Sequence, residues 1–217
     1  MLRERVPETD EGIQDGLTVE HFDVFQRSMR DRGLMETRDI IKSGIDGGTA
    51  LEVGPGPGYL GLEWLKATRD TRLTGIEISP NMIKMERRNA AEYGLTGRVT
   101  YVEGNGMKMP FPDGAFDGVF SNGSLHEWEY PERVFVEIHR VLKPGGRFYV
   151  SDLKRNMNLL IAWFMRVTVK PKEIKPGFDS SLAAAYTRAE MEKILRKAGS
   201  KANVKENAFG LIITGEK

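Results

Sequence analysis

The stretch Ala50-Leu51-Glu52-Val53-Gly54-Pro55-Gly56-Pro57-Gly58 decides the fold of this chain. Its first part is a short apolar run typical of a β-strand, and a helical pattern follows over residues 60–68. The glycines between them let the backbone turn sharply and approach a ligand that any Cβ atom would exclude. The N-terminus of the next helix presents free N–H groups to such a ligand. The stretch therefore predicts a strand, a ligand-binding loop and a helix in direct succession.

The sequence on both sides of this stretch alternates between strand-like and helix-like patterns. Further strands are predicted over residues 73–78, 99–103, 116–121, 147–151, 202–204 and 211–214. Helices are predicted from Pro80, behind Ser79 as N-cap, to Tyr93, from Pro131 to just before Lys143, and over residues 189–198. One or two amphipathic helices are expected within residues 18–43, with a break near Gly33. This alternation predicts βαβ units and a parallel sheet.

An acidic residue, Glu77, ends the second predicted strand nineteen residues after Gly58. A carboxylate there can accept hydrogen bonds from both hydroxyls of a ribose, which indicates an adenosine-containing ligand. The glycines follow G-x-G-x-G rather than the G-x-G-x-x-G of dinucleotide-binding loops. Glu52 would repel a pyrophosphate, whereas it suits the ammonium and sulfonium end of S-adenosylmethionine. A nicotinamide-dependent oxidoreductase on a similar sheet is the weaker alternative.

Residues 52–58 resemble motif I of the class I S-adenosylmethionine-dependent methyltransferases. The resemblance spans residues 48–152 and continues in Glu77, Gly104-Asn105-Gly106, Met109-Pro110-Phe111, Phe116-Asp117 and the segment 140–146. The chain is most similar to the small-molecule branch that includes the ubiquinone/menaquinone C-methyltransferases. The resemblance implies an α/β fold, with a Rossmann-like, doubly wound, mostly parallel sheet of about seven strands, an antiparallel last strand and helices on both faces. It also implies S-adenosylmethionine as cofactor and S-adenosylhomocysteine as product.

The resemblance assigns residues of this chain to parts of the cofactor. Gly54 and Gly56 would border the methionine portion, Glu77 would hold the ribose, and Ile78 would pack on the adenine. Asn105 would flank the adenine edge where the family usually has Asp, and an Asn still offers a carbonyl acceptor to the adenine amine. An ordinary tight turn at 105–106 and strand-ending chemistry at 121–122 are the alternatives. The expected cofactor-binding residues are Glu52, Gly54, Gly56, Gly58, Glu77, Ile78, Asn105, Gly106, Met107, Ser121 and Asn122.

His126 is the candidate catalytic base. It follows the fourth predicted strand, where the family often places a polar group facing the acceptor, and a base is needed only if the acceptor has a proton to lose. The alternative is a histidine that caps the next helix or lies on the surface. His21 and His139 fit structural roles on helices, and no metal site is expected.

We divide the single predicted domain into four parts: an N-terminal arm and helices over the site (1–43), a cofactor-binding core (44–152), an acceptor-side insert (153–185), and a C-terminal helix and strands (186–217). The first seventeen residues are expected to be a loose arm or a segment that orders on substrate. The apolar run 157–169 is interpreted as a lid or wall, with Trp163 or Phe164 facing an apolar acceptor. Core packing and a dimer contact are the alternatives.

Composition excludes several other classes of protein. The absence of cysteine rules out disulfides, thiolate metal sites and a catalytic thiol. A net charge of +1 does not call for a nucleic-acid partner. No apolar run is long enough for a spanning helix or a secretory signal, so a cytoplasmic location is expected. The expected function is methyl transfer to a small-molecule acceptor, apolar or aromatic, by a chain that could form a homodimer. The alternatives are a protein or nucleic-acid acceptor, or a catalytically silent cofactor-binding subunit.

Overall fold

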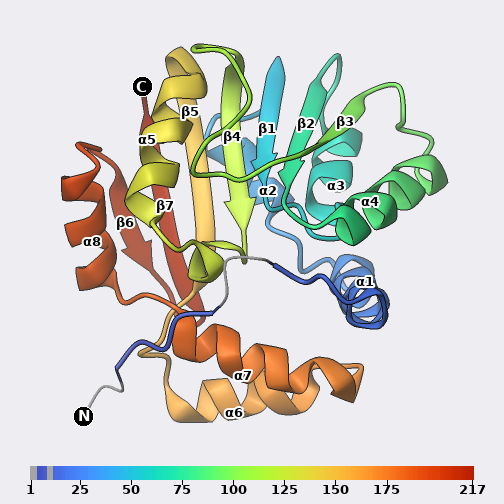
Figure 1. Ribbon diagram of the computed structural model, residues 1–217, viewed down its shortest axis with the longest axis vertical. Coiled ribbons are helices and arrows are strands. Elements are labelled where there is room, and N and C mark those ends of the chain that lie inside the picture. The colour runs from blue at the N-terminus through green and yellow to red at the C-terminus, as the bar shows by residue number, and fades with distance from the viewer. Residues whose placement is uncertain (1–3, 9–11) are drawn as a thin grey trace.

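A seven-stranded sheet organises the computed structural model, which describes residues 4–8 and 12–217 (Figure 1). The strand order is β3-β2-β1-β4-β5-β7-β6, with β1 to β5 parallel and β7 antiparallel to both of its neighbours. The order reverses between β1 and β4, the point at which open α/β sheets bind ligands beyond their carboxyl ends. The predicted fold class, including the antiparallel last strand, is confirmed.

The elements follow the predicted order closely. The strands are β1 (Thr49–Val53), β2 (Arg72–Glu77), β3 (Val99–Glu103), β4 (Phe116–Asn122), β5 (Leu142–Leu153), β6 (Asn203–Glu206) and β7 (Gly210–Glu216). The helices are α1 (Gly16–Asp31), α2 (Thr37–Lys42), α3 (Tyr59–Ala67), α4 (Pro80–Glu92), η1 (Leu125–Glu127), α5 (Pro131–Val141), α6 (Leu159–Thr168), η2 (Lys172–Ile174), α7 (Lys175–Ala184) and α8 (Arg188–Lys197). Among the described residues, no helix has the length and apolar character needed to cross a membrane.

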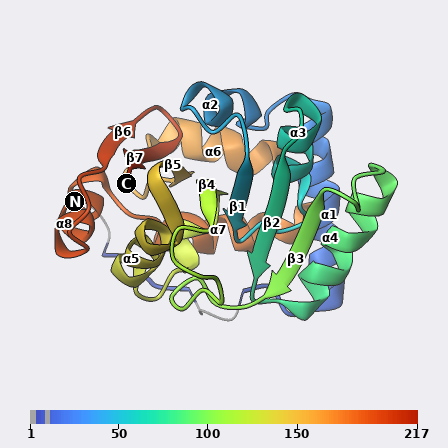
Figure 2. The same cartoon turned by 90° about the horizontal axis from the view of Figure 1, so that it is seen from above.

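Both faces of the sheet are covered, because successive side chains of a strand point to opposite sides. Leu51 and Val119 belong to the core under α5 and α8, whereas Ala50 and Phe120 belong to the core under α2, α3 and α4. Figure 2 shows α5 and α8 on one side of the sheet and α2 and α3 on the other. This double covering leaves the carboxyl end of the strands as the edge at which a site can form.

The N-terminal segment crosses that carboxyl edge. The amide of Val6 donates to the carbonyl of Ala183, and the hydroxyl of Ser79 donates to the carbonyl of Ile13 at 2.6 Å. Asp15 then caps α1 by accepting from the amide of Thr18 at 2.8 Å. The segment predicted as a loose arm is thus anchored over residues 4–8 and 12–15. Its residues 1–3 and 9–11 lie outside the described residues.

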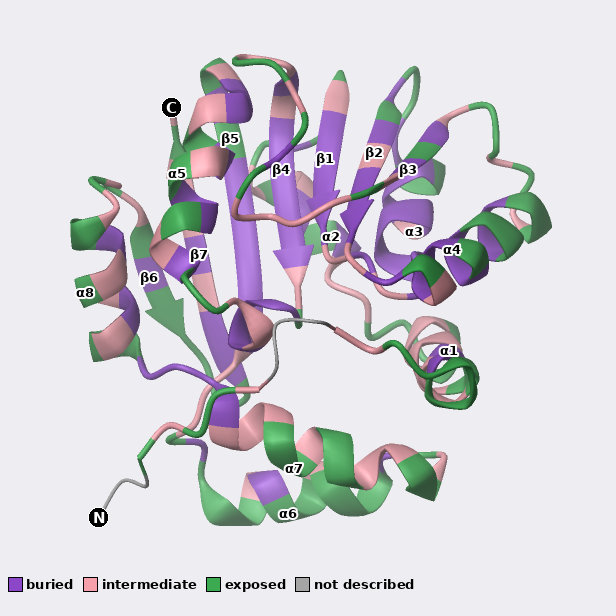
Figure 3. Ribbon diagram, in the orientation of Figure 1, coloured by how far each residue is buried: buried purple, intermediate pink, exposed green. Residues whose placement is uncertain are grey.

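The insert after β5 forms a helical hairpin below the carboxyl edge, and this corrects one prediction. Helix α7 contacts η1, whereas α6 packs on α7 at the outside of the molecule (Figures 1 and 3). The side chains of Trp163 and Phe164 are 63% and 59% exposed. They therefore do not face an acceptor in this structure, and core packing of the run 157–169 is excluded for most of α6, because α7 lies between α6 and the sheet.

Candidate active site

The glycine loop between β1 and α3 needs glycine for its backbone. Gly54, Gly56 and Gly58 have φ values of +65°, +58° and +84°, in the left-handed region that other residues rarely adopt. A Cβ on Gly54 would come within 2.7 Å of the Ser124 side chain, and one on Gly58 within 2.9 Å of the Tyr101 hydroxyl. The loop is therefore a close turn that leaves its backbone groups at the carboxyl edge of the sheet.

Glu77 joins the end of β2 to this loop. Its Oε1 atom accepts hydrogen bonds from the amides of Ile78 at 2.8 Å and Ser79 at 2.9 Å. Burial raises the pKa of Glu77, while these amides and the amide of Gly56 act in the opposite direction. The half-buried Ile78 follows it at the same edge, beneath Gly12. The predicted pair Glu77 and Ile78 thus lies beside the glycine loop.

Glu52, which is predicted to lie beside the cofactor's ammonium group, has a buried carboxylate behind the glycine loop. Its carboxylate points to the start of α3, where a Cβ on Gly61 would come within 2.2 Å of Oε2, and this oxygen is buried without a hydrogen-bond partner among the described residues. Burial, with a smaller contribution from the nearby charge of Glu77, raises the pKa of Glu52 well above its ordinary value. A hydrogen bond from the amide of Gly61 acts in the opposite direction but does not outweigh them. Glu52 therefore lies behind the loop, and the structure gives it no exposed oxygen beside a ligand's ammonium group.

The adenine-edge candidates form a tight turn after β3. Asn105 Oδ1 accepts from the amide of Met107 at 2.8 Å, so the carbonyl expected to face the adenine amine already holds the turn. Gly106 lies against Val53 and Val134, where a Cβ would approach within 3.3 Å and 3.5 Å. All three residues are half-buried at the same edge as Glu77.

Ser121 and Asn122 end β4 and bond to the neighbouring strands. Ser121 Oγ donates to the carbonyl of Val53 at 2.7 Å and contacts Ser124 Oγ at the same distance. Asn122 Nδ2 donates to Ser151 Oγ at 2.9 Å. Ser121 is buried, and its hydroxyl holds the glycine loop's strand in place, so it acts on the site from behind.

His126 on η1 is buried between two carboxylates. Its Nδ1 lies 2.8 Å from Asp152 Oδ2, and its Nε2 lies 3.3 Å from Glu8 Oε2. Burial disfavours the charged ring, but the charge and hydrogen bond of Asp152, with Glu127 and Glu8, outweigh it and raise the pKa of His126 to about 9. Burial also raises the pKa of Glu127 to about 7. At neutral pH the ring is therefore an imidazolium.

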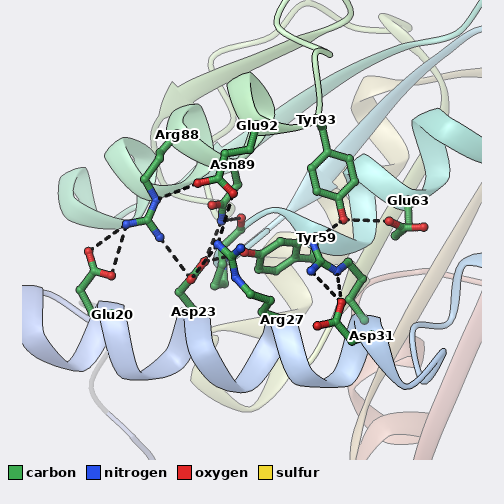
Figure 4. Close-up of polar contacts among 12 residues, drawn as sticks. Glu20, Asp23, Arg27, Asp31, Tyr59, Glu63, Arg88, Asn89, Glu92 and Tyr93 are labelled. Carbon is green, nitrogen blue, oxygen red and sulfur yellow. Dashed lines mark hydrogen bonds and ion pairs between the residues drawn. The ribbon is translucent and has the colours of Figure 1, made fainter.

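Helix α1 is fastened over the glycine loop by the buried carboxylate of Asp23 (Figure 4). Asp23 Oδ1 accepts from the Tyr59 hydroxyl at 2.9 Å and from Asn89 Nδ2 at 2.8 Å. Asn89 Nδ2 also donates to the carbonyl of Pro57 within the loop, at 2.8 Å. Asp23 and Asn89 thus tie α1, the start of α3, α4 and the loop together. The neighbouring Phe22 would lie 3.2 Å from a Cβ on Gly56.

Sequence reasoning missed four residues of this region: Glu8, Phe22, Asp23 and Asp152. Asp152 was detectable, because it stands at the carboxyl end of a predicted parallel strand, where sites form. Phe22 and Asp23 belong to an amphipathic helix whose partner no local pattern identifies. Glu8 sits in a segment without any periodicity.

The arrangement fits an adenosine-containing cofactor. A Cβ would fill the close turns of the loop at Gly54 and Gly58, and an acidic side chain ends the adjacent strand at Glu77. The helix that follows the loop directs its N-terminus toward the same edge. Together these features supply backbone donors, a ribose acceptor and apolar cover from Ile78.

Comparison with known proteins agrees with this geometry. The methyltransferase domain family matches residues 51–150. The chain is 29% identical over 167 residues to a demethylmenaquinone methyltransferase of Symbiobacterium thermophilum, covering 69% of this chain and 66% of the relative. It is 34% identical over 110 residues to a ubiquinone/menaquinone biosynthesis C-methyltransferase of an Enterobacter species, covering 50% of this chain and 44% of the relative. The chain therefore spans less than two thirds of either relative.

A solved structure supports the fold independently of the sequence match. The crystal structure of a methyltransferase dependent on S-adenosylmethionine from Aquifex aeolicus superposes with a TM-score of 0.70 at 21% identity. The superposition covers 94% of this chain and 99% of that one. Most of this chain therefore has a counterpart within one known architecture.

Proposed function

We propose that this chain, which matches the methyltransferase domain family over residues 51–150 and is similar to S-adenosylmethionine-dependent methyltransferases, transfers a methyl group to a small-molecule acceptor. The observation that carries the proposal is the left-handed glycine loop at Gly54, Gly56 and Gly58 beside Glu77. A loop of this shape with an acid at the end of the next strand suits the methionine and ribose parts of one ligand.

We assign cofactor contacts to the residues at the carboxyl edge. Glu77 would accept from the ribose hydroxyls, Ile78 would pack on the adenine, and the turn at Asn105 to Met107 would border its edge. Gly54 and Gly56 would lie along the methionine portion. Glu52, Gly58 and Ser121 shape the loop from behind, and Asn122 extends the same edge toward β5.

S-adenosylmethionine supplies a methyl group already activated on a sulfonium, so the chain's residues mainly supply proximity and orientation. His126 is the proposed base for an acceptor with a proton to lose. With a pKa of about 9 the ring carries its own proton at neutral pH, so its Nε2–H would first donate to an oxygen of an acceptor that takes the place of the Glu8 carboxylate, which lies 3.3 Å from Nε2 in the structure. The ring of His126 could accept a proton from the acceptor only when the ring itself is neutral. This neutral form becomes populated as the pH approaches 9.

The acceptor class we propose is a small apolar or aromatic molecule. The names of the two relatives specify demethylmenaquinone and the biosynthesis of ubiquinone and menaquinone, which are apolar ring compounds with ring oxygens that become phenolic hydroxyls in the reduced, quinol form. A ring of this kind suits a protonated histidine held by Asp152, because an imidazolium can bind a phenolic oxygen.

The test is release of S-adenosylhomocysteine from S-adenosylmethionine over a panel of quinols, phenols, amines and metabolite extract. Turnover with one acceptor and its loss in Glu77→Ala is the expected result. A chain that binds S-adenosylhomocysteine but turns over with no member of the panel would contradict the proposed activity.

Three finer assignments complete the proposal. We propose that residues 44–152 form the cofactor-binding core of one domain and residues 153–185 its acceptor-side insert. We also propose a cytoplasmic location and a homodimer, which cell fractionation and sedimentation equilibrium test directly.

A further inference from the structure

Helix α6 carries an apolar face that the described chain leaves uncovered. Leu159, Leu160, Trp163 and Phe164 are 85%, 76%, 63% and 59% exposed, and Val167 continues the same face one turn later. Their spacing of three to four residues places them on one side of the helix. Ala162, on the opposite side, is the buried residue of α6. Figure 3 shows α6 as mostly exposed, with α7 between it and the sheet.

A cluster of basic side chains follows this face directly. Lys170 and Lys172 are exposed and Lys175 is half-buried, and none of the three forms an ion pair within residues 4–8 and 12–217. Arg166 differs, since it pairs with Asp179 at 2.8 Å. Exposed aromatic and leucine side chains on one face, with lysines beside them, are the signature of a helix that lies in a membrane interface.

We propose that α6 docks this protein on an anionic lipid surface. Its apolar face would enter the boundary between headgroups and acyl chains, and Lys170, Lys172 and Lys175 would meet the lipid phosphates. A contiguous apolar patch of this kind is rare on a soluble monomer unless it is an interaction site.

Charge and area favour a bilayer over a second copy of this chain. Helix α6 has ten residues and is about 15 Å long. It offers five exposed apolar side chains, whereas a stable protein interface takes about 20–30 residues from each partner. A bilayer needs no such minimum area, because each lysine near an anionic surface adds about 1 kcal/mol to the burial of the apolar side chains.

The hairpin's position relates this surface to the site. Helix α7, on which α6 packs, contacts η1, and η1 carries His126. Docking through α6 would turn the carboxyl edge of the sheet toward the membrane. If the proposed function holds, an apolar acceptor could then enter from the lipid phase. The docking itself requires no turnover and is tested without an acceptor.

The experiment measures flotation with vesicles of phosphatidylcholine alone and of phosphatidylcholine mixed with phosphatidylglycerol. The protein is expected to float with the anionic vesicles, less so at high salt. The emission of Trp163, the exposed one of three tryptophans, should shift to the blue on binding. The double variant Trp163→Ser/Phe164→Ser should lose at least about tenfold in partitioning, since it removes two large apolar side chains.

A matched control is Phe209→Ser, which removes a side chain of similar exposure from the turn between β6 and β7. This variant should bind vesicles as the unaltered protein does. Equal vesicle binding by the double variant would overturn the proposal. The proposal would also be overturned if the unaltered protein does not bind vesicles and sediments as a dimer, while the double variant sediments as a monomer. In that case a second copy covers α6. Cofactor binding by calorimetry is unaffected by either outcome, so failure of the docking is distinct from failure of the proposed activity.

Discussion

His126 Nδ1 lies 2.8 Å from Asp152 Oδ2, and the backbone amide of the same histidine donates to that oxygen at 2.7 Å. The first residue follows β4 and the second ends β5, so two adjacent strands of the sheet position one imidazole. Because both side chains are buried, the orientation of the ring is fixed and its Nε2 atom points to the half-buried Glu8.

Asp152→Asn is expected to lower the pKa of His126 from about 9 toward the ordinary value of about 6.5. The raised pKa means that the folded protein binds a proton which the unfolded chain releases. The resulting stabilisation is fully present below about pH 6.5 and is lost as the pH rises through 9. The variant should therefore show a flatter decline of unfolding free energy over this interval.

Titration of the histidine Cε1–H resonances by NMR checks this directly. His21 and His139 lie outside the pair and serve as internal references. An unchanged midpoint for His126 in the variant would show that Asp152 does not control its charge. If His126 is the base, kcat/KM of the unaltered enzyme should rise with pH up to about 9, and that of the variant should level off earlier.

Glu77→Ala is expected to weaken S-adenosylhomocysteine binding at least tenfold, because hydrogen bonds to a charged group are worth about 1.5–3 kcal/mol each. Calorimetry gives the dissociation constant. Glu77→Gln keeps an oxygen for the amides of Ile78 and Ser79, so it separates loss of the ribose contact from loss of local structure. Glu103→Ala, at the paired and exposed end of β3, is the control and should bind normally. An unaltered constant for Glu77→Ala would remove Glu77 from the site.

Gly56→Val is expected to abolish S-adenosylhomocysteine binding. The sequence alone suggests an intact fold for this variant, but φ at Gly56 is +58°, so a side chain also costs about 1–2 kcal/mol of backbone strain. Gly199→Val is the matched control, because its φ of +68° imposes similar strain with open space around the Cβ position. Thermal melting should show comparable destabilisation of the two variants, and only Gly56→Val should lose binding. Retained binding in a folded Gly56→Val protein would show that Gly56 does not line the site.

Asp23→Ala is expected to lower the free energy of unfolding by about 3 kcal/mol. This is the lower end of the cost of breaking a buried ion pair, because the partner Arg88 stays partly in contact with water. The reason is that Tyr59 and Asn89 lose a common acceptor. Glu20→Ala removes one of the two exposed partners of Arg88, leaving Glu92, and should cost less than about 1 kcal/mol. Denaturant unfolding measures both. Equal effects of the two substitutions would mean that Asp23 does not fasten α1 to the loop.

The sequence by itself determined the strand, the loop and the helix around Gly54 to Gly58, together with the alternation that makes the sheet parallel. These features follow from local rules. Side-chain period, N-caps and glycines at left-handed positions act over a few residues and hold whatever the rest of the chain does. For the same reason Glu77 was found from its place at a strand end.

Only the tertiary structure decided what surrounds that loop. Asp23 binds residues of α3 and α4, Glu8 reaches His126 from a segment without pattern, and the carboxylate of Glu52 lies against the start of α3. The outward direction of Trp163 was equally beyond the sequence, because an apolar helix has the same pattern whether it lines a site, a core or a membrane. The partners of such groups lie tens of residues away, and their choice depends on how burial and charge balance in the whole fold.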